Sequence, residues 1–268
     1  MSESRVIKAR NLATGYDGRI IIPDITMTIP AGRISVLIGA NGCGKSTLLK
    51  AFCRLNKIYS GTVTLDERDI RAYAPREYAR SVGLLPQSPA VPEGISVREL
   101  VTRGRFPYRQ PLKGLADVDY QAVDNAIATM GIEMIADRNV DELSGGQRQR
   151  VWIALSLAQE TDILFLDEPT TFLDISYQIE ILELLVRLNR DKKTTIVMVL
   201  HDINLAARYA DYLFAMKQGR LIREGRPKEI IDEDLIREVY GMESRIITDP
   251  VYGTPNVIPV GNPGLLRQ

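Results

Sequence analysis

Gly39-Ala40-Asn41-Gly42-Cys43-Gly44-Lys45-Ser46-Thr47 is a glycine-rich segment between two apolar runs, and we call it the phosphate loop for the role predicted below. The apolar run before it, residues 34–38, predicts a buried strand, and residues 48–52 after it predict the first turns of a helix. A glycine-rich turn between a strand and a helix is the setting in which the pattern G-x-x-x-x-G-K-[ST] binds phosphate. We therefore predict a nucleotide-binding loop here, rather than a glycine-rich turn that holds no ligand.

The residue types of this loop suit a chain of phosphates. Glycines leave room for the backbone to wrap around the phosphates, with successive N–H groups pointing inward. The N-terminus of the helix adds a partial positive charge, and Lys45 adds a full one. Ser46 is the expected magnesium ligand, and Thr47 steadies the turn. The residues of the loop expected to bind the nucleotide are Gly39, Asn41, Gly42, Cys43, Gly44, Lys45, Ser46 and Thr47.

The composition is typical of a globular protein. A chain of 268 residues is long enough for one large domain or for a core with a subdomain. Apolar residues make up 45% and charged residues 25% of the chain, which are ordinary values. Because Lys+Arg and Asp+Glu both number 34, no net charge attracts the chain to nucleic acid or to anionic lipid.

The sequence also limits the compartment and the metal chemistry. No run approaches the roughly 18 apolar residues of a transmembrane helix, and residues 1–5 lack the apolar core of a signal peptide. We therefore expect a protein that neither spans a membrane nor is secreted. The two cysteines, Cys43 and Cys53, cannot form a disulfide framework, which fits a reducing cytoplasm. The single histidine, His201, excludes a metal site built of several histidines.

An antiparallel β layer is predicted before the phosphate loop. Residues 5–10 alternate in polarity as a strand does, and Gly15-Tyr16-Asp17-Gly18 is typical of a hairpin turn. The next strand is predicted in two segments, residues 20–22 and 25–29, broken by Pro23. Residues 61–66 alternate again and are expected to return to this layer.

The middle of the chain, residues 88–160, is more polar and helical in pattern. Helices are expected at residues 100–104, 120–130 and 144–159, after a short buried strand at residues 81–85. In the third helix, an apolar stripe at helical spacing consists of Val151, Ala154, Leu155 and Ala158. We expect Trp152 on the same helix to be a packing residue rather than a platform for a ligand.

Buried strands return after residue 160. Residues 162–166 and 195–200 are continuous apolar runs, separated by a helix on which one apolar face is expected. Such runs between helices predict a parallel sheet covered on both faces. Residues 212–216 and 220–224 predict a hairpin around Gln218-Gly219, and the proline-rich tail from Thr248 onward is expected to pack as extended chain. The residues expected on the apolar helix face are Ile175, Ile179, Leu182 and Val186.

The predicted fold class is therefore α/β. We expect a P-loop NTPase core with a mainly parallel sheet, an antiparallel β subdomain and an inserted helical subdomain. The whole chain, residues 1–268, is expected to form one domain. Residues 1–87 and 161–268 would form the nucleotide-binding core with its β layer, and residues 88–160 the helical subdomain.

Two carboxylates end the strand at residues 162–166. Asp167 and Glu168 follow it at the edge of the sheet where α/β proteins bind ligands. With a phosphate loop upstream, Asp167 is the expected magnesium-side carboxylate. Glu168 is then placed to orient or deprotonate a water that attacks the γ-phosphate. The alternative is a structural cap before Pro169.

Leu143-Ser144-Gly145-Gly146-Gln147, which we call the signature segment, opens the third predicted helix. Ser144 can cap the helix, and the two glycines leave backbone amides exposed at its N-terminus. By itself the pattern fits either a second anion site or a well-capped helix.

Together these motifs resemble the ATP-binding cassette (ABC) ATPases over nearly the whole chain. In that family two chains sandwich two ATP molecules, and the signature segment of one chain completes the site of the other. The resemblance implies that Ser144, Gly145, Gly146 and Gln147 bind the nucleotide held by a second copy. It also implies a homodimer and the cofactors ATP and Mg²⁺.

The same resemblance assigns further site residues. Tyr16 matches the aromatic residue that stacks on adenine, although a hairpin alone would also explain it. Gln87 matches the glutamine that reaches magnesium and the attacking water. Asp174 matches the residue that crosses the dimer interface, in a segment where Phe172 replaces the small residue usual in the family. His201, after the strand at residues 195–200, matches the switch histidine that contacts the γ-phosphate. The catalytic residues expected are Glu168, His201, Gln87 and Lys45, and the expected metal ligands are Ser46, Gln87 and Asp167.

Residues 78–87 and 97–108 narrow the resemblance to the bacterial importers of ferric siderophores, haem and vitamin B12. This implies two integral membrane permease subunits, an extracytoplasmic solute-binding protein as an indirect partner, and a peripheral place on the cytoplasmic face of the inner membrane.

Residues 87–108 would line the groove that receives the permease, unless they are an ordinary surface loop and helix. The other possibilities are an exporter-type or amino-acid importer ATPase, and an ABC ATPase acting on ribosomes or DNA. One phosphate loop and no basic excess argue against the nucleic-acid alternative.

Overall fold

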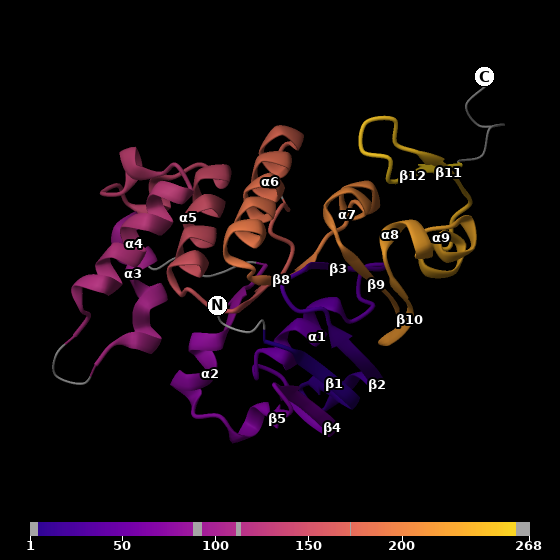
Figure 1. Ribbon diagram of the computed structural model, residues 1–268, viewed down its shortest axis with the longest axis horizontal. Coiled ribbons are helices and arrows are strands. Elements are labelled where there is room, and N and C mark those ends of the chain that lie inside the picture. Colours follow the sequence, from indigo (N-terminus) through magenta and orange to yellow (C-terminus); the bar gives the residue numbers. More distant parts are fainter. Residues whose placement is uncertain (1–4, 88–92, 111–113, 172, 261–268) are drawn as a thin grey trace.

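The computed structural model describes residues 5–87, 93–110, 114–171 and 173–260. At its centre is a six-stranded sheet in the order β10-β9-β3-β8-β7-β6. Five of these strands are parallel, and β10 pairs with β9 antiparallel at one edge, which confirms the predicted mainly parallel sheet (Figure 1). The strands of the central sheet are β3 (Ile34–Ile38), β6 (Val82–Leu85), β7 (Ile163–Leu166), β8 (Thr195–Val199), β9 (Tyr212–Lys217) and β10 (Arg220–Gly225).

The predicted antiparallel layer is a four-stranded sheet in the order β2-β1-β4-β5. Asp17 and Gly18 form the hairpin turn between β1 and β2, and both have positive φ angles, 50° and 76°. The strands are β1 (Ile7–Tyr16), β2 (Arg19–Ile29), β4 (Lys57–Leu65) and β5 (Arg68–Asp69), followed by the short helices η1 (Ile70–Ala72) and α2 (Pro75–Ser81).

The prediction that Pro23 breaks this segment into two strands is wrong, because β2 is continuous. β2 lies at the edge of its sheet, where a residue without an N–H is tolerated. The pairing with β1 shifts register between Thr14↔Ile22 and Leu12↔Ile25, so β2 carries one extra residue beside Pro23. This bulge accommodates the proline without ending the strand.

Helix α1 (Lys45–Phe52) lies between the two sheets (Figure 1). Leu48, Leu49 and Phe52 are buried in the hydrophobic cluster that both sheets contribute to. The ring of Phe52 stacks on Phe165 of β7 with 5.5 Å between centroids. Burial on several sides therefore fixes the helix that begins inside the phosphate loop.

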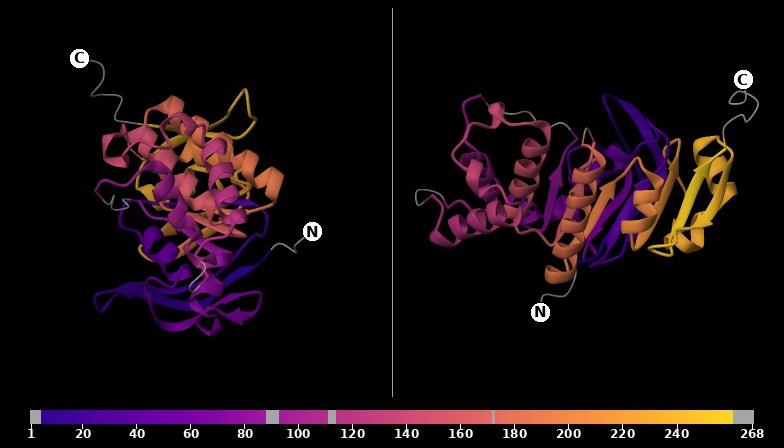
Figure 2. Two further views of the ribbon diagram at one scale, coloured as in Figure 1. Left: turned by 90° about the vertical axis from the view of Figure 1, so that its left-hand side faces the viewer. Right: turned by 90° about the horizontal axis from the view of Figure 1, so that it is seen from above.

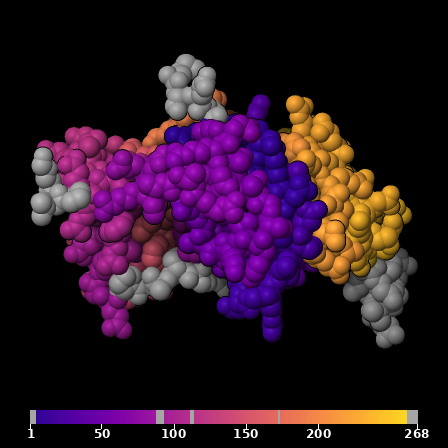
Figure 3. Space-filling model, turned by 90° about the horizontal axis from the view of Figure 1, so that it is seen from below, coloured from indigo at the N-terminus to yellow at the C-terminus, as the bar shows by residue number. Residues whose placement is uncertain are grey.

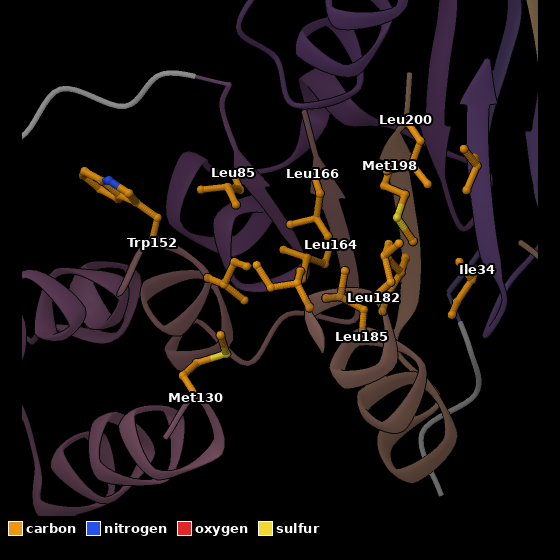
Figure 4. Packing of buried hydrophobic residues seen from close by; sticks show 14 of the residues in the cluster. Ile34, Leu85, Met130, Trp152, Leu164, Leu166, Leu182, Leu185, Met198 and Leu200 are labelled. Atoms are coloured by element: carbon orange, nitrogen blue, oxygen red, sulfur yellow. The ribbon is translucent and has the colours of Figure 1, made fainter. Parts of the chain in front are cut away.

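The central sheet is buried on both faces, as predicted from its continuous apolar strands. In β8, Val197 and Val199 face the cluster around α1, whereas Ile196 and Met198 belong to the second cluster, on the other face. Figure 4 shows Met198 in that second cluster, together with residues of the neighbouring strands and helices. Trp152 belongs to it and is 9% exposed, which confirms its prediction as a packing residue.

A group of helices extends from one end of the sheet. The first of them, α3, begins at Val97, three residues before the predicted start, because Ser96 caps it. The Ser96 hydroxyl accepts a hydrogen bond from the Glu99 amide, and the Glu99 carboxylate accepts one from the Ser96 amide. The division at residues 88 and 160 stays a prediction. The elements of this region are α3 (Val97–Thr102), η2 (Arg103–Tyr108), α4 (Asp117–Thr129), η3 (Glu133–Ile135), η4 (Val140–Glu142) and α5 (Gly145–Ala158).

The predicted apolar face of α6 (Ile175–Lys192) is only partly correct. Ile175 is 74% exposed, and the buried residues are Ile181, Leu182 and Leu185. The helical period identified Leu182, but a period alone does not determine which neighbours complete the stripe.

The C-terminal part forms more structure than the sequence predicted. It contains α7 (Ile203–Tyr209), α8 (Pro227–Ile230), α9 (Glu233–Tyr240), β11 (Ser244–Thr248) and β12 (Pro255–Pro259). β11 and β12 pair antiparallel, so the extended chain expected after Thr248 is present at residues 255–259, as a strand of a two-stranded sheet that the sequence did not predict. Two prolines bound β12 without preventing it, because Pro255 is its first residue and Pro259 its last. The rest of the tail, including Pro263, lies outside the described residues.

Figure 2 places the α3–α5 region and the C-terminal elements at opposite ends of the long axis. The antiparallel layer lies between these ends on the face shown in Figure 3. In the described part of the chain, no helix has both the length and the apolar character needed to cross a bilayer.

Candidate nucleotide-binding and hydrolysis site

The phosphate loop connects β3 to α1 through three glycines with positive φ. The φ angles of Gly39, Gly42 and Gly44 are 147°, 75° and 106°. A Cβ atom on Gly39 would lie 2.3 Å from the Met216 carbonyl oxygen, so no larger residue fits there. The loop conformation therefore depends on glycine both for backbone angle and for space.

Lys45 is the first residue of α1, and its ammonium group lies inside the loop. Its Nζ donates hydrogen bonds to the carbonyl oxygens of Gly39 at 2.7 Å and Ala40 at 3.1 Å. The residue is only 5% exposed, and Nζ lies 3.8 Å from Sγ of the buried Cys43. The charge of Lys45 is thus held by two carbonyl oxygens of the loop itself, and its contact with a phosphate stays a prediction.

Ser46 and Asp167 come together from the phosphate loop and the end of β7. The Ser46 hydroxyl donates a hydrogen bond of 2.8 Å to Oδ1 of Asp167. Asp167 is 2% exposed, and this burial raises the pKa of its carboxyl group, with the charge of Glu168 adding to the effect and the Ser46 hydrogen bond opposing it. A hydroxyl and a carboxylate held together are hard oxygen ligands of the kind that Mg²⁺ prefers.

Three side chains contact the carboxylate of Glu168. Its backbone has a φ of 55°, a left-handed conformation that is rare for residues other than glycine. Oε1 lies 2.7 Å from Nε2 of His201, and Oε2 accepts hydrogen bonds from Gln87 and from Thr171. Gln87, Glu168 and His201 follow three neighbouring strands, and the structure brings them together as the sequence implied.

The signature segment forms the N-terminus of α5. The Ser144 hydroxyl accepts from the Gln147 amide at 3.3 Å, and Oε1 of Gln147 accepts from the Ser144 amide at 3.2 Å. Nothing lies within 4 Å of where a Cβ on Gly145 would be, so this helix end faces open space. The capping predicted for Ser144 is present, and whether a nucleotide binds here stays a prediction.

Tyr16 and Asp174 lie at the surface. Tyr16 ends β1 and is 52% exposed, so its ring is available for stacking. Asp174 caps α6, and its carboxylate accepts from the amide of Tyr177 and the hydroxyl of Ser176. These bonds hold the pKa of the Asp174 carboxyl group below its usual value, the Tyr177 amide having the largest effect. The neighbouring Phe172 lies outside the described residues.

Two contacts of this site were missed in the sequence. Thr171 donates to Glu168 at 3.0 Å. The phenolic oxygen of Tyr240 in α9 accepts a 3.1 Å hydrogen bond from the Gly39 amide. No local pattern indicates Tyr240, because it lies 201 residues from Gly39 in the chain.

Comparison with known proteins agrees with this geometry. The model of the ABC transporter family matches residues 22–171. The chain is 51% identical over 255 residues to the probable siderophore transport system ATP-binding protein YusV of Bacillus subtilis, covering 95% of this chain and 93% of that protein. It is 49% identical over 255 residues to the ferric enterobactin transport ATP-binding protein FepC of Escherichia coli, covering 95% of this chain and 94% of that protein.

A solved structure is also similar. The dimeric structure of a bacterial ABC transporter cassette matches with a TM-score of 0.72 and 28% sequence identity, covering 82% of this chain and 98% of that one. The family match, the near full-length relatives and the site at the carboxyl ends of the strands agree. The chain therefore belongs to the ABC transporter family and is one of its ATPases.

Proposed function

We propose that the chain is the ATP-hydrolysing subunit of a bacterial importer of ferric siderophores. The observation that carries this proposal is the similarity of 49% and 51% identity, over 95% of the chain, to two proteins named for siderophore transport. Two copies would pair with two permease subunits at the cytoplasmic face of the inner membrane. Haem and vitamin B12 are the alternative cargoes. In an importer of this kind the cargo does not contact the ATPase subunit, so the choice of cargo rests on the relatives alone.

We propose that Ser46 and Asp167 hold Mg²⁺ with the ATP phosphates, with Gln87 as a further ligand. The fit rests on the two oxygen atoms that already lie 2.8 Å apart at the mouth of the phosphate loop. The ion would neutralise charge on the phosphates. Lys45 would bind the same phosphates directly, as the buried cation of the loop.

Glu168 is the proposed general base for the attacking water. Its side chain is 9% exposed and is held from both carboxylate oxygens, which fixes the direction in which it accepts a proton. His201 and Gln87 contact this carboxylate, so they can couple its position to the presence of the γ-phosphate.

The site of one chain is proposed to be incomplete. In the signature segment, Gly145 lies exposed at a helix N-terminus, which suits the γ-phosphate of ATP bound to a second copy. Closing of two copies around two ATP molecules would move the α3–α5 regions and change the accessible side of the permease. Hydrolysis would reopen the pair.

His201→Ala is expected to lower ATP turnover by about 10²-fold, the effect of removing one donor aimed at transition-state charge. Nucleotide affinity should stay within about twofold, because His201 is not part of the phosphate loop. Steady-state hydrolysis and titration with a fluorescent ATP analogue would measure the two quantities. Normal turnover in the variant would remove His201 from the catalytic residues.

The function is tested by purification of the tagged chain from membranes of its own host, grown with little iron. We expect two hydrophobic permease subunits to co-purify, and uptake of a radiolabelled ferric siderophore to stop when Glu168→Gln replaces the chromosomal copy. Haem and vitamin B12 uptake, measured in the same cells, distinguish the alternative cargoes. Co-sedimentation with ribosomes or DNA, without a permease, would contradict the proposal.

A further inference from the structure

A contact from the C-terminal part of the chain reaches the first glycine of the phosphate loop. Gly39 is buried, and its amide donates a 3.1 Å hydrogen bond to the phenolic oxygen of the half-buried Tyr240. A buried N–H without an acceptor is unfavourable, so this hydroxyl stabilises one orientation of the loop.

Tyr240 is supplied by a well-anchored element. It is the last residue of α9, and Gly241 caps the helix in a left-handed conformation with a φ of 68°. Leu235, Ile236 and Val239 of the same helix are all buried in the hydrophobic cluster on the α6 side of the central sheet. Nζ of Lys217 in β9 also donates to the Glu238 carbonyl at 2.6 Å, which ties the end of α9 to the central sheet. The hydroxyl therefore approaches Gly39 from a fixed direction.

Gly39 also contacts Lys45, the charged residue of the loop. The Gly39 amide binds Tyr240, and the Gly39 carbonyl accepts the 2.7 Å hydrogen bond from Nζ of Lys45. Both polar groups of one glycine are thus engaged, one by α9 and one by the lysine that faces the phosphates. Burial raises the pKa of Tyr240 to about 12, so the hydroxyl stays neutral at physiological pH.

We propose that Tyr240 is a positioning residue for ATP binding, which holds Gly39 and through it Lys45 in the conformation that receives the phosphates. Tyr240 lies beyond residues 22–171, the part matched by the family model, so the C-terminal part of the chain becomes a component of the nucleotide site. Without the hydroxyl, the loop would spend only part of its time in the binding conformation. Apparent ATP affinity would then fall by that fraction, whereas saturating ATP would restore the competent loop.

The test is Tyr240→Phe in the full-length chain, with Tyr209→Phe as its matched control. Tyr209 is also partly buried, but the hydrogen bonds that hold Gly39 and Lys45 do not involve its hydroxyl. We expect Tyr240→Phe to weaken ATP binding about tenfold and to raise KM for ATP equally, with kcat within twofold of the unmodified chain. Tyr209→Phe should leave both quantities unchanged.

ATP affinity of Tyr240→Phe within twofold of the unmodified chain would overturn the proposal. A loss of kcat at unchanged affinity would also overturn it, because the hydroxyl would then act on a later step. Unfolding midpoints of both variants, measured without nucleotide, show whether either substitution destabilises the whole protein. If Tyr240→Phe lowers the unfolding midpoint together with the ATP affinity, the loss of affinity would be explained by instability, and the positioning role would be contradicted. The assay uses the isolated subunit and ATP, so its outcome is independent of cargo and permease.

Discussion

Glu168→Gln is expected to lower ATP turnover by about 10²–10⁴-fold while ATP still binds, the range typical of general acid–base catalysis. Glutamine has nearly the same shape and can keep hydrogen bonds around this position, but it cannot accept a proton from water. The side-chain contacts of Glu168 with Gln87, Thr171 and His201 involve its carboxylate, and none of them includes a residue of the phosphate loop, so the loop should remain intact. Single-turnover hydrolysis and nucleotide titration separate the chemical step from binding.

The matched control for this variant is Glu183→Gln. Glu183 lies on the exposed side of α6, and its side chain pairs only with Arg187 of the same helix among the described contacts. Its turnover should equal that of the unmodified chain. If Glu168→Gln retained more than about a tenth of the turnover, Glu168 would not be the general base.

Lys45→Met should weaken ATP binding by about 10- to 100-fold. The substitution removes a charge-assisted hydrogen bond to phosphate, worth about 1.5–3 kcal/mol, and leaves an apolar chain of similar length in the loop. Equilibrium binding of ATP and of AMP distinguishes this loss from misfolding. AMP lacks the β- and γ-phosphates that Lys45 is proposed to bind, so weak AMP binding should be little affected.

Lys192→Met is the control for this second variant. Lys192 is the exposed last residue of α6 and does not belong to the phosphate loop. The Lys192→Met variant should bind ATP with the affinity of the unmodified chain. Equal ATP affinity in Lys45→Met and Lys192→Met would show that Lys45 does not bind the phosphates.

Much of the fold was predictable because its signals are local. Each of these signals is contained in a segment of a few residues. Examples are the glycine spacing of the phosphate loop, the apolar runs of β7 and β8, and the turn at Asp17-Gly18. Asp167 and Glu168 were predictable for a related reason, since carboxyl ends of parallel strands meet at one edge.

The remaining features depend on contacts between distant segments. The continuity of β2 through Pro23 follows from its edge position and from a bulge against β1, neither of which a local proline signal contains. The burial of Ile181 rather than Ile179 depends on how α6 meets the sheet. The hydrogen bond between Tyr240 and Gly39 joins residues with no pattern in common.

If one chain carries only half of an ATP site, the molar mass of Glu168→Gln in solution should depend on ATP. Light scattering after gel filtration should give the mass of one chain without nucleotide and twice that mass with ATP. The same variant carrying Ser144→Arg, which places a bulky cation at the signature segment, should bind ATP but keep the mass of one chain. A single-chain mass for Glu168→Gln with ATP bound would show that ATP does not join two chains.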